Sequence, residues 1–133
     1  MTRKEAREQA FILIFEKSFR EESMEEIIAD ALEHGLIASD DYVEAVTKGV
    51  EAQQEALDAR ITANLKGWTL SRLSRVALAA LRLAVYEMLY MQDIPTGVSI
   101  NEAVELTKKF ATEDDAAYIN GVLGTIAREG AHA

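Results

Sequence analysis

The sequence predicts an all-α protein, a bundle of six or seven helices with short connections. Apolar residues recur at helical spacing along most of the chain, and no segment shows the alternating β-branched pattern of a strand. Helix-start patterns of the form Ser/Thr-x-x-Glu occur three times, and the chain has only one Pro. Its 133 residues suit one domain, or two small helical halves that share an interface.

Three helices are expected in the first half of the chain. The first two open on capping boxes, in which a Ser or Thr side chain accepts from a free backbone N–H and a Glu three residues later reaches back. These boxes are Thr2-x-x-Glu5 and Ser23-x-x-Glu26. Gly35 is expected to end the second helix. The predicted ranges are about 3–19, 24–34 and 40–64, the last without a break.

The second half is expected to begin with a short helical turn near residues 71–74, followed by an apolar helix over about 75–91. Arg82 and Glu87 are the only charged residues inside that helix. A helix that is apolar on nearly all sides is buried on nearly all sides. We therefore expect it to be the central element of the fold.

Two further helices are expected at the end of the chain. A third capping box, Ser99-x-x-Glu102, predicts a helix that begins at Ser99 and ends near Phe110. Thr112 or Asp114 then begins a last helix, which runs to about residue 129. These two helices complete the predicted bundle.

Composition and motifs argue against an enzyme. Without Cys there is no disulfide, thiolate metal site or Cys nucleophile, and the two His residues, His34 and His132, lie far apart in the sequence. Gly121-x-x-Gly124 lies within a helical pattern and is interpreted as close helix packing rather than a phosphate loop. The acidic residues of segment 21–64 are interpreted as solvated helix faces. No catalytic residue, cofactor or metal site is predicted.

The charge is unevenly distributed. The formal net charge is −9, with +2 in residues 1–20, −10 in residues 21–64 and −1 in the remainder. Contact with a nucleic acid must therefore be local, because phosphate contacts need basic side chains. No apolar run approaches the roughly 20 residues that span a bilayer, and the first residues are not a secretory pattern. A soluble, cytoplasmic protein with no membrane contact is predicted.

The first helix carries the most informative surface. Arg3 and Arg7 are one turn apart, and none of the helix neighbours of Arg7 is acidic, so both arginines are expected to be unpaired and ready to bind an anion. Phe11 and Phe15 follow on the neighbouring face, where they either stack on an unpaired base or, as we favour, join the core. Replacing both arginines with Ala is expected to weaken RNA binding and leave the melting temperature nearly unchanged.

Six segments, in this order and spacing, resemble one known family. They are Ala6-Arg7-Glu8-x-Ala10, Trp68-x-Leu70-x-Arg72-Leu73, Leu81-Arg82-Leu83-Ala84-x-Tyr86-Glu87-Met88, Asp93-Ile94-Pro95, Val98-Ser99-Ile100-Asn101-Glu102-Ala103-x-Glu105-Leu106 and Tyr118-Ile119-Asn120-Gly121-Val122-Leu123. From Arg3 to about Ile126, the chain resembles the NusB transcription antitermination proteins.

This resemblance implies a single NusB-like domain of two packed helical bundles, at about residues 1–66 and 67–133. It also implies a non-enzymatic function. Proteins of this family bind the single-stranded boxA RNA element together with NusE, a small-subunit ribosomal protein. The complex joins the RNA polymerase elongation complex and suppresses premature termination, notably in ribosomal RNA operons. Some members pair with themselves, which leaves a homodimer open.

The family's RNA-contacting residues can be carried over to this sequence. Its arginine-rich N-terminal segment falls on Arg3, Lys4 and Arg7. The aromatic residue before the Asn-Gly motif corresponds to Tyr118, and Asp114 lies close to it. The candidate RNA-binding residues are Arg3, Lys4, Arg7, Phe15, Asp114 and Tyr118.

The NusE surface of the family is formed largely by the C-terminal bundle, so Arg75, Arg82 and Glu102 are candidates for it or neighbours of it. Ala77 stands where the family usually has an acidic residue. Further departures are Ala111 in place of a usual Gly and Gly124 in place of a usual acid. The net charge and Ala77 support an alternative hypothesis, a helical protein–protein adaptor that keeps NusE binding but has little RNA affinity.

Most shared motif residues are interpreted as structural. Trp68, Leu81, Tyr86 and Leu106 are expected in the core. The Asn120-Gly121 pair is expected to let two helices approach closely. Only the basic and aromatic edges of the family pattern then concern RNA.

Overall fold

The computed structural model describes residues 1–130, and all the regular secondary structure found there is helical. The elements are α1 (Arg3–Lys17), α2 (Met24–Glu33), α3 (Asp41–Ala52), α4 (Gln54–Thr62), the 3-10 turn η1 (Leu70–Arg72), α5 (Arg75–Tyr90), α6 (Thr96–Phe110) and α7 (Glu113–Arg128). The predicted all-α class is therefore confirmed.

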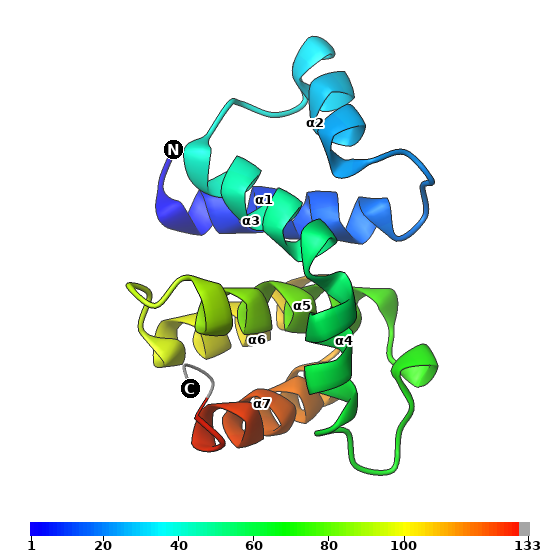
Figure 1. Ribbon diagram of the computed structural model, residues 1–133, viewed down its shortest axis with the longest axis vertical. Helices are drawn as coiled ribbons and strands as arrows, with labels where there is room; N and C mark the ends of the chain where they lie inside the picture. The colour runs from blue at the N-terminus through cyan, green and yellow to red at the C-terminus, as the bar shows by residue number, and fades with distance from the viewer. Residues whose placement is uncertain (131–133) are drawn as a thin grey trace.

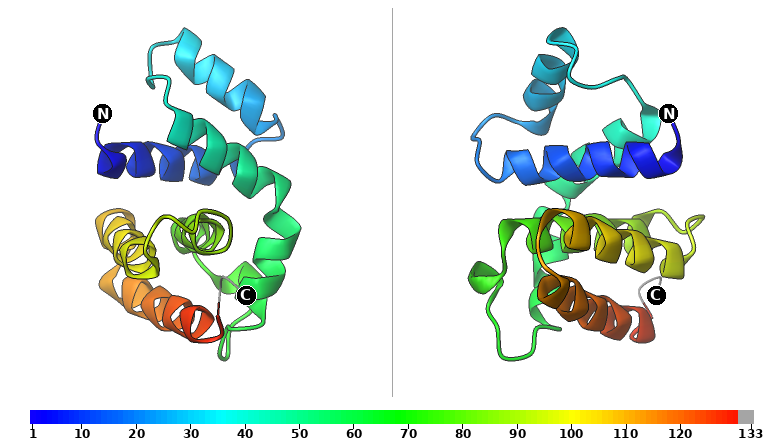
Figure 2. Two further views of the ribbon diagram at one scale, coloured as in Figure 1. Left: turned by 60° about the vertical axis from the view of Figure 1, so that its left-hand side comes forward. Right: turned by 180° about the vertical axis from the view of Figure 1, so that it is seen from behind.

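The helices form two packed groups. Figure 1 shows α1, α2 and α3 in the upper group and α4, α5, α6 and α7 in the lower one. Helix α5 contacts α1, α3, α4, α6 and α7, and the left view of Figure 2 shows it end-on among them. Leu81 and Leu83 point to different sides of α5, and both are buried. The prediction that this helix is central is confirmed.

Local hydrogen bonds set the ends of the first two helices. Both predicted capping boxes form, with Thr2 and Glu5 at the start of α1 and Ser23 and Glu26 at the start of α2. The residue after α2's cap, Gly35, has φ +69°, a left-handed conformation that favours glycine and stops a helix. These signals lie within a few residues of each other, which is why the sequence predicts them correctly.

The prediction of one unbroken helix over residues 40–64 is wrong. The helix is interrupted at Gln53, where φ is −106° and ψ is 13°, and it continues as α4 in a new direction. Leu57 and Ile61 of α4 are buried, and α4 packs on α5 and α7. Because α3 packs on α1 instead, the change of direction lets each half bury its own apolar face. No Gly or Pro marks the break, and the two groups meet near Gln53 rather than near residue 66.

The third predicted capping box is also wrong. Helix α6 begins at Thr96, directly after Pro95, so Ser99 lies inside the helix rather than at its N-cap. The Ser99 side chain is buried, and its hydroxyl donates to Glu87 Oε1 at 2.7 Å. Ser99 therefore serves the buried carboxylate of another helix.

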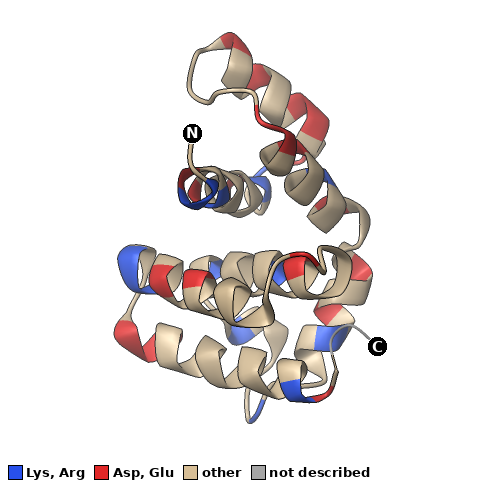
Figure 3. Ribbon diagram, turned by 90° about the vertical axis from the view of Figure 1, so that its left-hand side faces the viewer, with Lys and Arg blue, Asp and Glu red and all other residues tan. Residues whose placement is uncertain are grey.

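The acidic side chains of segment 21–64 are mostly exposed, as expected for solvated faces, and Figure 3 shows them along α2. Asp58 is an exception, because both of its carboxylate oxygens accept from Arg82. Within the described residues, no three His, Asp or Glu side chains are grouped so that they could hold a metal ion. The same part of the chain has no helix that is long and apolar enough to cross a membrane.

Close helix packing occurs at Gly49, not at the predicted Gly121. A Cβ atom at Gly49 would lie 2.2 Å from the ring of Tyr86, so α3 and α5 approach closely there. At Gly121 a Cβ atom would meet nothing within 4 Å, so the close-packing interpretation of Asn120-Gly121 is wrong.

These two glycines support a matched stability prediction. Gly121→Ala is expected to stabilise the fold by up to about 1 kcal/mol, because Ala is the better helix former. Gly49→Ala gains the same propensity but forces the Tyr86 ring to move, which costs about 1–3 kcal/mol. We expect Gly49→Ala to be about 2 kcal/mol less stable than Gly121→Ala in urea denaturation. Equal stability of the two variants would contradict the close approach at Gly49.

Candidate nucleic-acid interface

Arg7 does not lie on the surface. Its side chain is 5% exposed, and its Nε donates to Glu87 Oε2 at 2.8 Å. Its Nη1 also lies 3.9 Å from Glu102 Oε1. The prediction that Arg7 is unpaired is therefore wrong. Its partner is 80 residues away in the sequence, so inspection of the neighbours on its own helix does not find it.

Glu87 is the centre of a buried polar cluster. It accepts from Arg7, from the Tyr42 hydroxyl and from the Ser99 hydroxyl, so that α1, α3, α5 and α6 meet at one carboxylate. Within residues 1–130 no buried side-chain nitrogen or oxygen lacks a hydrogen-bond partner. A satisfied network of this kind makes the relative position of the helices specific.

Burial and the charge of Glu87 raise the pKa of Tyr42 above its ordinary value, so the phenol stays protonated and donates. Burial by itself lowers the pKa of Arg7. The hydrogen bond and the charge of Glu87 outweigh that effect, and the pKa lies above its ordinary value. Arg7 therefore remains a cation whose charge is used inside the protein.

Arg3 and Lys4 remain on the surface at the start of α1, where Figure 3 shows basic residues beside the N-terminus. The Arg3 guanidinium lies 4.4 Å from the centre of the Tyr42 ring. This cation–π contact orients Arg3 without neutralising its charge. The Lys4 side chain is 71% exposed, and its Nζ lies 3.0 Å from Glu102 Oε2. Two cations are therefore presented to solvent there, one of them without a carboxylate.

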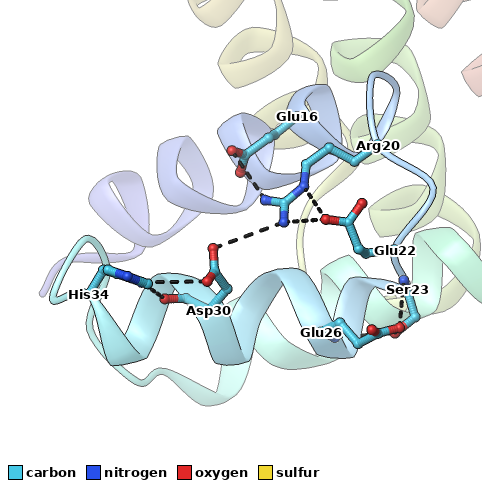
Figure 4. Close-up of polar contacts among 7 residues, drawn as sticks. All are labelled: Glu16, Arg20, Glu22, Ser23, Glu26, Asp30 and His34. Carbon is cyan, nitrogen blue, oxygen red and sulfur yellow. Dashed lines mark hydrogen bonds and ion pairs between the residues drawn. The ribbon is translucent and has the colours of Figure 1, made fainter.

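The opposite end of α1 contributes no free positive charge from Arg20. Figure 4 shows its guanidinium among Glu16, Glu22 and Asp30. The distances are 3.6 Å to Glu16, 2.6 Å to Glu22 and 4.0 Å to Asp30. The Glu22 hydrogen bond raises the pKa of Arg20, so the arginine stays charged but is surrounded by carboxylates. The basic surface of residues 1–20 is thus smaller than the count of basic residues predicts.

The aromatic residues of α1 form a row. Phe11 is buried and lies 5.5 Å from Phe110, which agrees with the preferred core interpretation. Phe15 is partly buried between Phe11 at 6.5 Å and Phe19 at 5.1 Å. Phe19 is 60% exposed, and Arg75 lies over its ring. Phe15 therefore has only part of its ring available to a ligand.

A second aromatic surface lies on α7. Tyr118 is partly buried, and its hydroxyl accepts from the backbone N–H of Lys66 at 3.2 Å. Asp114 is exposed one turn earlier on the same helix. Trp68 lies 5.7 Å from Tyr118 and is 50% exposed, so the prediction that Trp68 belongs to the core is wrong. Leu81 and Leu106 are buried as predicted, and Tyr86 packs against the core partly buried.

The three partner candidates do not share one surface. Arg82 donates from two nitrogens to Asp58, at 2.8 Å each, and thereby links α5 to α4. Arg75 donates to the Ser18 carbonyl at 2.6 Å, near the end of α1, whereas Glu102 contacts Lys4 at its start. Arg75 and Arg82 do line one hollow of about 470 Å³ between the two helix groups.

A match to the NusB family extends over residues 4–128 of the chain. The chain belongs to the NusB family. It is 42% identical over 129 residues to the transcription antitermination protein NusB of Listeria monocytogenes serotype 4a, with 97% of this chain and 98% of that protein covered. It is 45% identical over 130 residues to the protein of the same name from Acetivibrio thermocellus, covering 96% and 90% respectively.

The fold agrees with this family. The chain matches a crystal structure of the antitermination factors NusB and NusE in complex with dsRNA with a TM-score of 0.85 and 29% identity, covering 96% of each chain. The predicted resemblance to NusB proteins is confirmed over nearly the whole length. The individual RNA and partner residues stay predictions.

Proposed function

We propose that the protein is an RNA-binding transcription antitermination factor. It binds boxA-type RNA together with NusE and joins the RNA polymerase elongation complex in the cytoplasm, notably on ribosomal RNA operons. The observation that carries the proposal is the near-complete structural match to a NusB chain whose crystal structure holds NusE and RNA. We also propose that two copies can pair, which the single chain leaves open.

In this proposal the exposed cations at the start of α1 contact RNA phosphates. Arg3 does so from its position above Tyr42, and Lys4 does so by leaving or sharing Glu102. Tyr118, with Asp114 one turn away, contacts a base, and Phe15 offers the edge of its ring. Arg7 has a different role, because its buried ion pair with Glu87 places α1 on the C-terminal group. Arg75, together with Arg82 in the hollow beside it, is the proposed NusE contact.

The adaptor hypothesis draws support from a specific observation. Two of the five basic residues in segment 1–20, Arg7 and Arg20, are engaged by carboxylates, and the net charge of the chain is −9. A protein with so few free cations binds RNA weakly by itself. NusE binding that is unaffected by RNA at every salt concentration would favour the adaptor.

The test is fluorescence anisotropy of a labelled boxA-type RNA across a salt series, with and without NusE. Each lost phosphate contact lowers the slope of log affinity against log salt by about 0.7 for single-stranded RNA. We expect Arg3→Ala and Lys4→Ala each to lower the slope by about that amount. Tighter binding in the presence of NusE is also expected.

Lys48→Ala is the matched control. Lys48, like Lys4, is partly exposed and paired with a glutamate, but it lies on α3. Its removal changes the net charge as much as Lys4→Ala does and is expected to leave the slope unchanged. If Lys4→Ala and Lys48→Ala behave alike, only net charge matters and the patch assignment is wrong.

A further inference from the structure

A cleft beside Tyr118 brings together features that the contacts at the start of α1 do not use. It has a volume of about 300 Å³, at the lower end of the range for ligand sites. It lies between α7 and the segment that follows α4. The residues that line it are Asn64, Lys66, Ala117, Tyr118, Gly121, Val122, Thr125 and Arg128.

Free positive charge gathers around this cleft. Within residues 1–130, six Lys and Arg side chains have no carboxylate at ion-pairing distance: Arg3, Lys17, Lys66, Arg72, Arg75 and Arg128. Lys66 and Arg128 line the cleft, and Arg72 lies 5.9 Å from the neighbouring Trp68 ring. The nearby Glu129 is engaged by Arg60 and Asn64. In an acidic protein, this arrangement favours an anionic ligand.

The floor of the cleft is open where Gly121 lies. No atom would be within 4 Å of a Cβ there, so packing does not require a glycine at this helix position. Gly121 is exposed and lies nearly one turn beyond Tyr118 on α7. The missing side chain lets a flat ring reach the helix backbone beside the Tyr118 ring.

The order of groups along α7 gives the cleft a polarity. Asp114 stands at one end and Arg128, held by Thr125 Oγ1 at 3.1 Å, stands at the other. A phosphate is favoured near Arg128 and Lys66, while the carboxylate of Asp114 favours the donor groups of a base. Cations for phosphate and aromatic rings for a base together match one unpaired nucleotide of a single strand.

We propose that this cleft is a second RNA-contact site, in which one unpaired nucleotide lies on Gly121 beside Tyr118 with its phosphate between Lys66 and Arg128. The proposal rests on the proposed RNA-binding function and adds to it a subsite with its own residues. Arg72 and the exposed half of Trp68 extend the site toward the next nucleotide.

Trp68 is the only tryptophan of the chain, so its fluorescence reports on the cleft alone. Adding unlabelled boxA-type RNA to the complex with NusE, if NusE itself is dark or corrected for, is expected to quench the Trp68 emission in parallel with the anisotropy signal. A mononucleotide such as UMP, which lacks the contacts at α1, is expected to quench it only at far higher concentration. Equal quenching by UMP would identify a free-nucleotide site and overturn the proposal.

Gly121→Leu fills the cleft without a clash, and we expect it to weaken RNA binding about ten-fold, within the range measured for loss of one stacked base. Gly97→Leu is the matched control, because Gly97 is also exposed on a helix with nothing within 4 Å of a Cβ. The control should bind RNA as the unchanged protein does. Melting curves of both variants should show that the fold is retained.

The outcomes separate this proposal from the function on which it rests. If RNA binds and responds to Lys4→Ala, but Gly121→Leu binds normally and Trp68 emission is unchanged, the second site is wrong and the RNA-binding function stands. If no RNA binds with or without NusE, both proposals are wrong. If Gly121→Leu and Gly97→Leu weaken binding equally, the effect is not local and the second site is also wrong.

Discussion

Arg7→Ala is expected to lower the free energy of unfolding by about 3–5 kcal/mol, the usual cost of removing one partner of a buried ion pair. The change leaves the Glu87 carboxylate, which is 0% exposed, without its only ion-pair partner in the described residues. Tyr42 and Ser99 would still donate to Glu87, but neither supplies a positive charge. Urea denaturation monitored by circular dichroism measures the loss.

Arg3→Ala is the matched control, the same substitution one turn earlier on the same helix. Arg3 is exposed and contacts only the Tyr42 ring, so we expect a change within about 0.5 kcal/mol. This pair replaces the expectation from sequence that both arginines can be removed without loss of stability. A loss below about 1 kcal/mol for Arg7→Ala would contradict a structural role for its ion pair.

Leu81→Ala and Leu83→Ala are each expected to destabilise the fold by about 2–5 kcal/mol. The two side chains are 0% and 1% exposed, although they are separated by about 200° around the helix. A helix at the surface would show a large loss on one side only. Two large losses are expected here because α5 is enclosed by five other helices. Chemical denaturation of the two variants measures both values.

Leu36→Ala provides the comparison for the same type of truncation outside the core. Leu36 is 75% exposed, so its replacement is expected to change the free energy of unfolding by less than about 0.5 kcal/mol. If either α5 variant resembled Leu36→Ala, that side of α5 would not be a packed core surface, and its central position would need revision.

The buried cluster connects stability to the proposed RNA surface. Glu87 holds the Tyr42 hydroxyl, and the ring of Tyr42 lies beneath Arg3. Arg7 ties α1 to the same carboxylate. The exposed cations at the start of α1 are thus presented from a helix whose position is set by groups on α3, α5 and α6. A residue of the family pattern can therefore affect RNA binding without touching RNA.

Much of the helical structure follows from the sequence alone. The capping boxes at Thr2 and Ser23 and the stop at Gly35 depend on hydrogen bonds and backbone angles within a few residues. The central position of α5 follows from its composition, because a helix with so few charges must be buried on most sides. The acidic faces of segment 21–64 follow from the cost of burying unpaired carboxylates.

Only the tertiary structure decided which of several locally reasonable alternatives is realised. Ser99 has a capping pattern, yet the need of a buried carboxylate for donors places it inside α6. The break at Gln53 has no Gly or Pro, because it arises from two cores that lie in different directions.

The same holds for the candidate site. Arg7 and Tyr118 both belong to the family pattern, but one is paired inside the protein and the other lines an open cleft. The partner of Arg7 is 80 residues away, and the groups around Tyr118 come from a segment that precedes it by 52 residues. Local hydrogen bonding and periodicity can be inferred from neighbouring residues. Which charge is neutralised and which surface stays open depends on contacts that exist only after the chain has packed.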